Sequence, residues 1–250
     1  RKLLIAAAES NLKQVTLELG GKSPFILFPD ADLDRAIDKL FGGIFINKGE
    51  ICNAASRLLV HREIYQQVTE RVAARAAALK VGDPLDPETT IGAQVSEAQL
   101  NRVLGYIEKG KAEGARLVTG GGRDSEGANA RGYFCRPTVF ADVDPDMTIA
   151  QEEIFGPVLS IIPFEDEHHA VRIANNSVYG LAASIWTREI GRAHRMASAI
   201  EAGAVWVNTF NGFDSCAPFT GFKLSGYGTD LSTQAVEHYT RRKCVWIETA

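Results

Sequence analysis

Apolar positions along this chain form two kinds of pattern that alternate. Short apolar runs bounded by turn residues predict buried strands at residues 25–28, 56–60, 115–119, 158–163, 182–187 and 204–207. Stripes with a period of about 3.6 residues predict helices at residues 33–44, 63–79, 96–113, 166–175 and 190–200. Because parallel strands are joined by helices that cover the faces of the sheet, this alternation indicates parallel pairing. We therefore expect an α/β fold.

The two ends of the chain fit this alternation less well. Residues 1–14 have the spacing of a helix and residues 15–19 that of a strand, and the chain begins inside this helix without Met or an N-cap residue. The last apolar run, residues 244–247, has no partner in the alternation. We expect it to add to another sheet as an edge strand.

Two side chains stand out as candidates for chemistry. Glu18 lies in an apolar strand, where a charged carboxylate is costly to bury, so it either faces water or acts as a base. Cys52 lies in a turn between a helix and a strand. It is either a small buried apolar residue or a nucleophile whose thiolate is favoured by nearby backbone N–H groups. Considered alone, Glu18 is more commonly a carboxylate that faces water, and Cys52 is more commonly a buried apolar residue.

Glu18 and Cys52 each belong to a longer motif, and four further motifs follow them along the chain. These motifs are Glu18-Leu19-Gly20-Gly21-Lys22-Ser23-Pro24, Gly49-Glu50-Ile51-Cys52, Glu152-Glu153-Ile154-Phe155-Gly156-Pro157, Asn175-Asn176-Ser177, Gly203-x-Val205-Trp206-Val207-Asn208, and Pro218-Phe219-Thr220-Gly221-Phe222-Lys223-x-Ser225-Gly226. Together they resemble the aldehyde dehydrogenase superfamily over nearly the whole chain. The resemblance implies a parallel-sheet catalytic domain with fragments of a Rossmann-like cofactor domain.

The resemblance also implies a role for individual residues. Cys52 matches the nucleophile of the family, and Glu18 matches the general base that activates water. The family's cofactor, NAD or NADP, would contact Glu153 through its nicotinamide ribose, with Phe155 and Leu19 beside the ring. The residues that would surround a small-molecule aldehyde substrate are Phe45, Ile51, Asn53, Phe210, Phe213, Ser215 and Cys216. The aromatic residues among them have a second interpretation as ordinary core residues.

The resemblance divides the chain into four segments. Residues 1–20 would end the dinucleotide-binding domain, residues 21–218 form the catalytic domain, residues 219–242 return to the cofactor domain, and residues 243–250 provide a strand to a neighbouring subunit of a homodimer or homotetramer. Family members are roughly twice as long as this chain. We therefore expect a fragment, inactive by itself because most of the cofactor domain is absent.

Three departures from the family pattern bear on activity. Glu50 replaces a usual Gln, Thr220 replaces a Gly, and Thr229-Asp230 replace Arg-Glu. A second negative charge near Cys52 would raise the proton affinity of the thiol. A catalytically silent relative with the same fold is therefore the alternative hypothesis.

Composition and charge exclude several other classes of protein. The net charge of -4 provides no basic surface for nucleic acid or an anionic membrane. No apolar run reaches the roughly 20 residues of a membrane span. The four cysteines form no Cys-x-x-Cys pair and have few His neighbours, so we expect no metal site and free thiols, as in a reducing, cytoplasmic compartment.

Two further enzyme classes fail on particular residues. A phosphate-binding loop ending in Gly21-Lys22-Ser23 would need a glycine at position 16, which is Thr. A cysteine protease would need a histidine partner for Cys52, and no histidine lies in a supporting motif.

Ser96 and Gln99 have the spacing of a capping box, in which each side chain bonds the other's backbone N–H.

Overall fold

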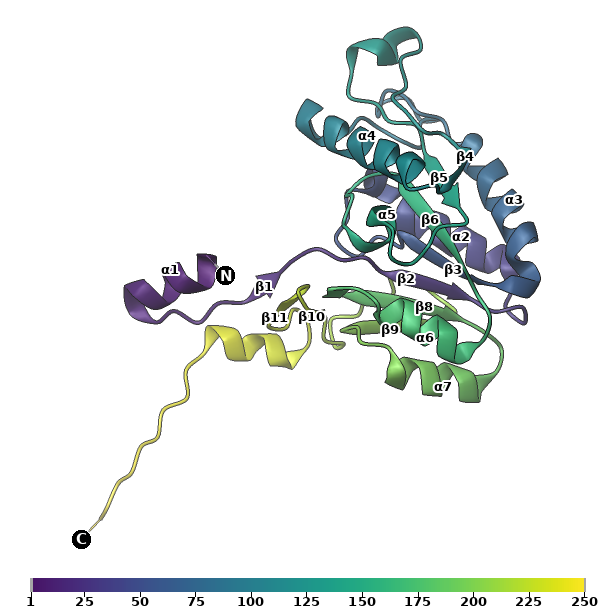
Figure 1. The fold of residues 1–250 in the computed structure, drawn as a ribbon. Coiled ribbons are helices and arrows are strands. Elements are labelled where there is room, and N and C mark those ends of the chain that lie inside the picture. Colours follow the sequence, from purple (N-terminus) through teal and green to yellow (C-terminus); the bar gives the residue numbers. More distant parts are fainter. Residues whose placement is uncertain (1, 250) are drawn as a thin grey trace.

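A seven-stranded sheet organises the structure, a computed structural model that describes residues 2–249 (Figure 1). In spatial order its strands are β4 (Arg116–Thr119), β5 (Thr138–Ala141), β6 (Val158–Phe164), β3 (Arg57–His61), β2 (Pro24–Leu27), β8 (Ala182–Trp186) and β9 (Ala204–Val207). All neighbours pair in parallel except β4 and β5, which pair antiparallel. The predicted α/β fold is confirmed, with β4 as an exception at one edge.

Helices cover both faces of the sheet. One face carries α4 (Glu97–Ala112), α5 (Thr148–Gln151), α6 (Glu167–Asn175) and α7 (Ile190–Ala199), and the other carries α2 (Leu33–Ile44) and α3 (Tyr65–Ala77). Successive residues of β2 point to opposite faces, so Ile26 packs in the first core while Phe25 and Leu27 pack in the second. The strands are therefore buried on both sides, which explains their continuous apolar runs.

Three of these helices begin at a polar N-cap residue, at the point where turn residues give way to the apolar helical pattern. Asp32, Ser96 and Asp166 each accept a hydrogen bond from the backbone N–H three residues later. The capping box predicted at α4 is only half formed. Ser96 caps the N–H of Gln99, but the Gln99 amide donates instead to the carbonyls of Ile154 and Phe155.

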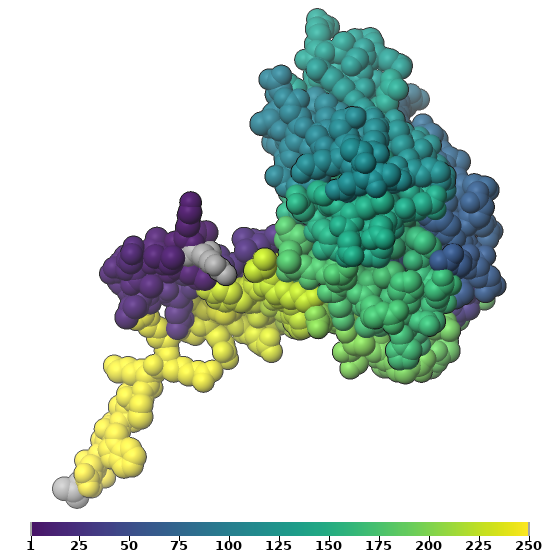
Figure 2. Space-filling view, in the orientation of Figure 1, coloured from purple at the N-terminus to yellow at the C-terminus, as the bar shows by residue number. Residues whose placement is uncertain are grey.

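Both ends of the chain project away from the sheet (Figures 1 and 2). Helix α1 (Lys2–Asn11) is shorter than predicted and buries no residue, and β1 (Leu17–Glu18) pairs antiparallel with β11 (Gly226–Tyr227). A second small pair joins β7 (Tyr179–Gly180) to β10 (Phe222–Lys223). Arg1 and Ala250, at the ends of two predicted segments, lie outside the described residues.

The strand predicted at residues 244–247 is not formed within this chain. Its backbone is irregular there, and Val245, Trp246 and Ile247 are exposed. A strand needs a partner for its backbone groups, and this single chain provides none at that place. Pairing with a neighbouring subunit stays a prediction.

The remaining short elements are 3₁₀ turns at Ile46–Gly49, Arg62–Ile64, Gly127–Arg131 and Thr233–Tyr239. Within residues 2–249, no helix combines the length and the apolar character that a bilayer span requires.

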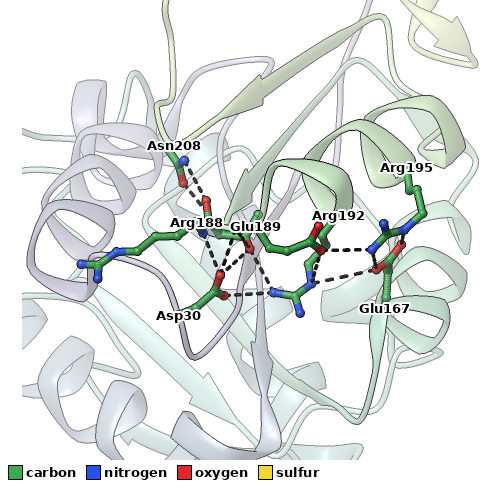
Figure 3. Close-up of polar contacts among 8 residues, drawn as sticks. Asp30, Glu167, Arg188, Glu189, Arg192, Arg195 and Asn208 are labelled. Atoms are coloured by element: carbon green, nitrogen blue, oxygen red, sulfur yellow. Dashed lines mark hydrogen bonds and ion pairs between the residues drawn. The ribbon is translucent and has the colours of Figure 1, made fainter.

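A network of charged side chains fixes the start of α7 against the end of β2 (Figure 3). The Asp30 carboxylate accepts hydrogen bonds from Thr187 Oγ1 (2.8 Å) and from the backbone N–H groups of Arg188 (2.8 Å) and Glu189 (3.2 Å). Arg192 Nη1 donates to its other oxygen at 3.0 Å. Burial opposes ionisation of Asp30, but these hydrogen bonds and the Arg192 charge outweigh it, so the pKa of Asp30 is lowered.

Removing this carboxylate should weaken the fold. We expect Asp30→Ala to lower the free energy of unfolding by roughly 1–2 kcal/mol, because backbone donors at the start of α7 lose their acceptor. Asp30→Asn, which keeps an acceptor but no charge, should cost less. Because the folded-state pKa is lowered, the charge stabilises above about pH 4, and its contribution is lost as pH falls through the folded-state value. Urea unfolding at two pH values measures both effects, and equal stability of Asp30→Ala and the parent chain would contradict the assignment.

Candidate active site

Three turns meet at the amino ends of neighbouring parallel strands. Gly20 and Gly21 precede β2, Cys52 precedes β3, and residues 153–156 precede β6. A methyl group added at Gly21 would lie 2.7 Å from the Cys52 carbonyl oxygen, and one added at Gly20 would collide with the Glu153 carboxylate. The turns are therefore in direct contact, and glycine is what allows their approach.

Cys52 is half-buried at the centre of this contact. Burial raises the pKa of its thiol, the charges of Glu18 and Glu153 raise it further, and the N–H groups of Asn53 and Cys52 only partly offset this. The sequence left two interpretations of Cys52 open, a buried apolar residue or a nucleophile with a favoured thiolate. In this chain the balance is against the thiolate, because burial and two carboxylates outweigh the backbone donors.

Glu50 does not contribute the negative charge expected beside Cys52. Its buried carboxylate accepts a hydrogen bond from the Val95 N–H (2.9 Å) and lies 3.2 Å from Lys48 Nζ. The expectation that Glu50 raises the proton affinity of the thiol was wrong, because the carboxylates that act on Cys52 are Glu18 and Glu153.

Glu18 is exposed at the edge of the site, on the short strand β1. Partial burial and the nearby charge of Asp230 raise the pKa of its carboxyl group. The β1–β11 pairing and a hydrogen bond from the Leu19 N–H to the Ser225 carbonyl (3.1 Å) hold this strand. Glu18 therefore faces water and also lies close enough for its charge to act on Cys52.

Glu153 is half-buried against the glycine turn. Its Oε1 accepts a hydrogen bond from the Gly21 N–H at 3.2 Å. Burial raises the pKa of Glu153, while that hydrogen bond and the charges of Lys22 and Arg102 oppose the rise. Arg102 also donates to the Glu153 carbonyl at 2.7 Å, which fixes the backbone of the turn.

Apolar surface lies next to Glu153. Phe155 has a left-handed backbone (φ 60°) and is 37% exposed, and Leu19 is 43% exposed. A large exposed aromatic residue in strained backbone is unusual outside binding sites. Glu153, Phe155 and Leu19 therefore combine a carboxylate with apolar surface that a flat ring would cover.

The residues predicted around the substrate separate into two groups. Phe45 and Phe210 are buried in the hydrophobic core, in agreement with the second interpretation of the aromatic residues, and Ile51 packs against the same core. Asn53 is buried and donates to Asn211 Oδ1 at 2.7 Å. The role of these four as pocket residues stays a prediction.

The other three predicted pocket residues, Phe213, Ser215 and Cys216, are exposed. Phe213 lines a cleft of about 310 Å³ with Trp206 and Phe219, and its ring meets that of Trp206 edge to face at 5.6 Å between centroids. Ser215 and Cys216 lie on the loop beside this cleft, so this group is the more accessible from solvent, while Ile51 of the first group is partly exposed.

Sequence reasoning missed residues that act through the backbone. Gln99 and Arg102 hold the carbonyls of the Glu153–Phe155 turn, and no local signal in the sequence marks them.

Lys22 is fully buried, and its Nζ has no hydrogen-bond partner among the described residues. Burial, together with the nearby charge of Arg57, lowers the pKa of Lys22 to about 7, against the opposing charges of Glu153 and Glu152. Residues 2–249 contain no cluster of three or more His, Cys, Asp or Glu side chains arranged for a metal ion.

Known proteins are similar to this chain in sequence and in fold. The sequence profile of the aldehyde dehydrogenase family matches residues 1–245. An aldehyde dehydrogenase of Emericella nidulans is 50% identical over 245 residues, which are 98% of this chain and 48% of that protein. A betaine aldehyde dehydrogenase of Rhizobium etli is 48% identical over 242 residues, 97% of this chain and 50% of that protein.

Solved structures agree. The NAD+ complex of an aldehyde dehydrogenase from Bacillus cereus superimposes with a TM-score of 0.94 at 46% identity, covering 100% of this chain and 50% of that one. The chain thus spans about half the length of the relatives it matches.

Proposed function

Because this chain belongs to the aldehyde dehydrogenase family, we propose that the whole protein oxidises an aldehyde to a carboxylic acid with NAD+ or NADP+. The observation that carries the proposal is the contact of three turns, which brings Cys52, Glu18 and Glu153 to one place. Relatives named for aldehyde oxidation, and a relative solved with NAD+, support the choice of reaction and cofactor.

Cys52 acts first in the proposed mechanism. Its thiol loses a proton and the sulfur adds to the aldehyde carbon, giving a tetrahedral thiohemiacetal whose oxyanion the backbone N–H of Cys52 can stabilise. The raised pKa of Cys52 means that a base must assist this deprotonation near neutral pH.

Glu18 acts on the second half of the reaction. After the hydride has left the tetrahedral carbon, the acyl group is a thioester on Cys52. Water must attack that thioester, and a carboxylate with a raised pKa is a better base for the water's proton than an ordinary one. The exposure of Glu18 gives water access to it.

The residues beside Glu153 fit a nicotinamide cofactor. Two carboxylate oxygens suit two ribose hydroxyls, and the exposed Phe155 and Leu19 offer apolar surface for a flat ring. Such a cofactor, when bound, accepts the hydride from the tetrahedral carbon. Glu153 and Phe155 then hold and orient it.

Assembly and domain division are part of the proposal. Residues 1–20 and 219–242 would belong to the cofactor domain and residues 21–218 to the catalytic domain. The exposed apolar side chains within residues 243–250 would pair with a second copy of the chain. A cytoplasmic location also stays a prediction.

Steady-state turnover of the whole protein tests the function. A panel of aliphatic, aromatic and cationic aldehydes, each with NAD+ and with NADP+, should reveal formation of reduced nicotinamide and of the matching acid. The raised pKa of Cys52 favours the second candidate, a catalytically silent relative. Binding of the cofactor without turnover on any aldehyde would establish that candidate instead.

Gly20 provides a test of the cofactor contact. The three atoms nearest a methyl group at position 20 all belong to the carboxylate end of Glu153, which can move, so the fold should survive. We expect Gly20→Ala to raise the KM for NAD+ about tenfold or more, the equivalent of losing one charge-assisted hydrogen bond, with a smaller change in the KM for aldehyde.

Gly42→Ala is the matched control, because a methyl group there meets no atom within 4 Å. It should leave both KM values unchanged. An unchanged KM for NAD+ in Gly20→Ala would contradict the role of Glu153.

A further inference from the structure

The turn that leads to Cys52 is built from strained backbone. Asn47, Lys48 and Gly49 follow one another with φ of 47°, 54° and 78°. Left-handed backbone is unfavourable for residues with a side chain and persists only where the surroundings hold it. Three bonds within the turn contribute to this: Asn47 Nδ2 donates to the Glu50 carbonyl (2.8 Å), Lys48 Nζ to Asn47 Oδ1 (2.9 Å), and the Glu50 N–H to the Asn47 carbonyl (3.0 Å). Contacts from outside the turn must supply the rest.

Glu50 makes the main contact from outside. Its side chain is buried, and each carboxylate oxygen has a partner, the Val95 N–H at 2.9 Å and Lys48 Nζ at 3.2 Å. Gln94 Nε2 adds a longer bond to the Lys48 carbonyl at 3.4 Å. Lys48 is thus tied to Gln94 through its carbonyl and to Val95 through the Glu50 carboxylate. A buried charge with both partners in place is compensated, whereas loss of the carboxylate leaves the Val95 N–H unpaired and leaves the Lys48 ammonium with a neutral partner, Asn47 Oδ1 at 2.9 Å.

The same segment also holds the turn on the cofactor side. Val95 directly precedes Ser96, the N-cap of α4. In this helix Gln99 donates to the Phe155 carbonyl at 2.6 Å, and Arg102 donates to the Glu153 carbonyl at 2.7 Å. Phe155 is itself left-handed. Residues 94–102 therefore contact both strained turns of the site from one rigid helix start.

We propose that Glu50 is a positioning residue for Cys52. Its carboxylate ties the strained turn Asn47–Gly49 to the start of α4 and thereby sets where Cys52 lies relative to the Glu153–Phe155 turn. The inference rests on the proposed role of Cys52 as nucleophile. It assigns a use to the glutamate that stands where the family usually has Gln, because an amide could accept from Val95 but would not neutralise the charge of the partly buried Lys48.

Site-resolved alkylation of Cys52 tests this in the whole protein. Iodoacetamide labelling is followed by mass spectrometry of the peptide that contains Cys52, across pH up to the plateau where the thiol is fully ionised. Glu50→Leu keeps similar volume and removes both contacts. We expect its plateau rate constant to rise about fivefold, because a loosened turn exposes the half-buried sulfur, while kcat falls about tenfold because the sulfur is misplaced.

Two milder variants separate the contacts and remain useful if Glu50→Leu does not fold. Glu50→Gln keeps the Val95 acceptor, and Lys48→Met removes the charged partner together with its hydrogen bond to Asn47 Oδ1. Each should raise the plateau rate constant about twofold. Unchanged plateaus in both variants would overturn the proposal.

Val68→Ala is the control for general destabilisation. Val68 is buried on α3, away from the turn, so its truncation lowers the melting temperature without touching Glu50. Its Cys52 plateau should match the parent protein, and an equal rise there would overturn the proposal. If the parent protein shows no turnover, the proposed function fails, but the alkylation comparison still decides the role of Glu50.

Discussion

Replacing Cys52 by alanine should abolish aldehyde oxidation by the whole protein, with a loss in kcat on the order of 10⁴-fold or more. The expectation follows from covalent catalysis, because without sulfur there is no tetrahedral adduct from which hydride can leave. Formation of reduced nicotinamide from a saturating aldehyde measures it. The KM for NAD+ should change little, because the predicted cofactor contacts are made by Glu153 and Phe155.

Cys135→Ala is the matched control for loss of a thiol. Cys135 is fully buried, and burial raises the pKa of its thiol to about 12, so it is inert at neutral pH. This variant should keep turnover within about threefold of the parent, even if it melts earlier. Substantial turnover in Cys52→Ala would exclude Cys52 as the nucleophile.

The pH dependence of labelling gives a second readout on the same sulfur. Since burial and the charges of Glu18 and Glu153 raise the pKa of Cys52, its alkylation rate should rise with pH above the range of an ordinary thiol. Free N-acetylcysteine, alkylated under the same conditions, provides the comparison. An inflection for Cys52 below that of the free thiol would contradict this balance of burial and charge.

Replacing Glu18 by glutamine should stop the cycle after the first turnover. Hydride transfer does not need this carboxylate in the proposed mechanism, whereas hydrolysis of the thioester does. We therefore expect a burst of reduced nicotinamide equal to the number of active sites, then steady-state turnover lowered by about 10²- to 10³-fold. Rapid-mixing absorbance measures both phases, and mass spectrometry should find the acyl group on Cys52.

Asp230→Asn is the companion variant. The Asp230 charge raises the pKa of Glu18, so its removal should lower that pKa and move the acid limb of the steady-state rate to lower pH. A Glu18→Gln variant with unchanged turnover and no burst would remove Glu18 from the mechanism.

Periodicity predicted most helices and strands because strands buried on both faces must be continuously apolar and surface helices must be amphipathic. It missed β5 (Thr138–Ala141), which is short and follows a proline-containing turn. It also predicted a strand at residues 244–247 that one chain cannot form, because backbone pairing needs a partner that no local pattern supplies.

The candidate site shows the same limit. The motifs identified Glu18, Cys52, Glu153 and Phe155, since reactive and cofactor-binding groups are fixed by residue type and order. They did not indicate that the Gln99 side chain donates to the Phe155 carbonyl instead of completing the capping box, because this contact joins residues 56 positions apart. For Phe45 and Phe210 the sequence left a pocket role and a core role open, and the structure buries both residues in the core.

The sequence by itself determined which reactive groups are present and the order of helices and strands along the chain, because local propensity and side-chain chemistry are properties of the residues themselves. Only the tertiary structure decided the direction of the Cys52 pKa and the partners of Glu50. Both depend on burial and on distances between segments far apart in the chain, and electrostatic energies change steeply with exactly those two quantities.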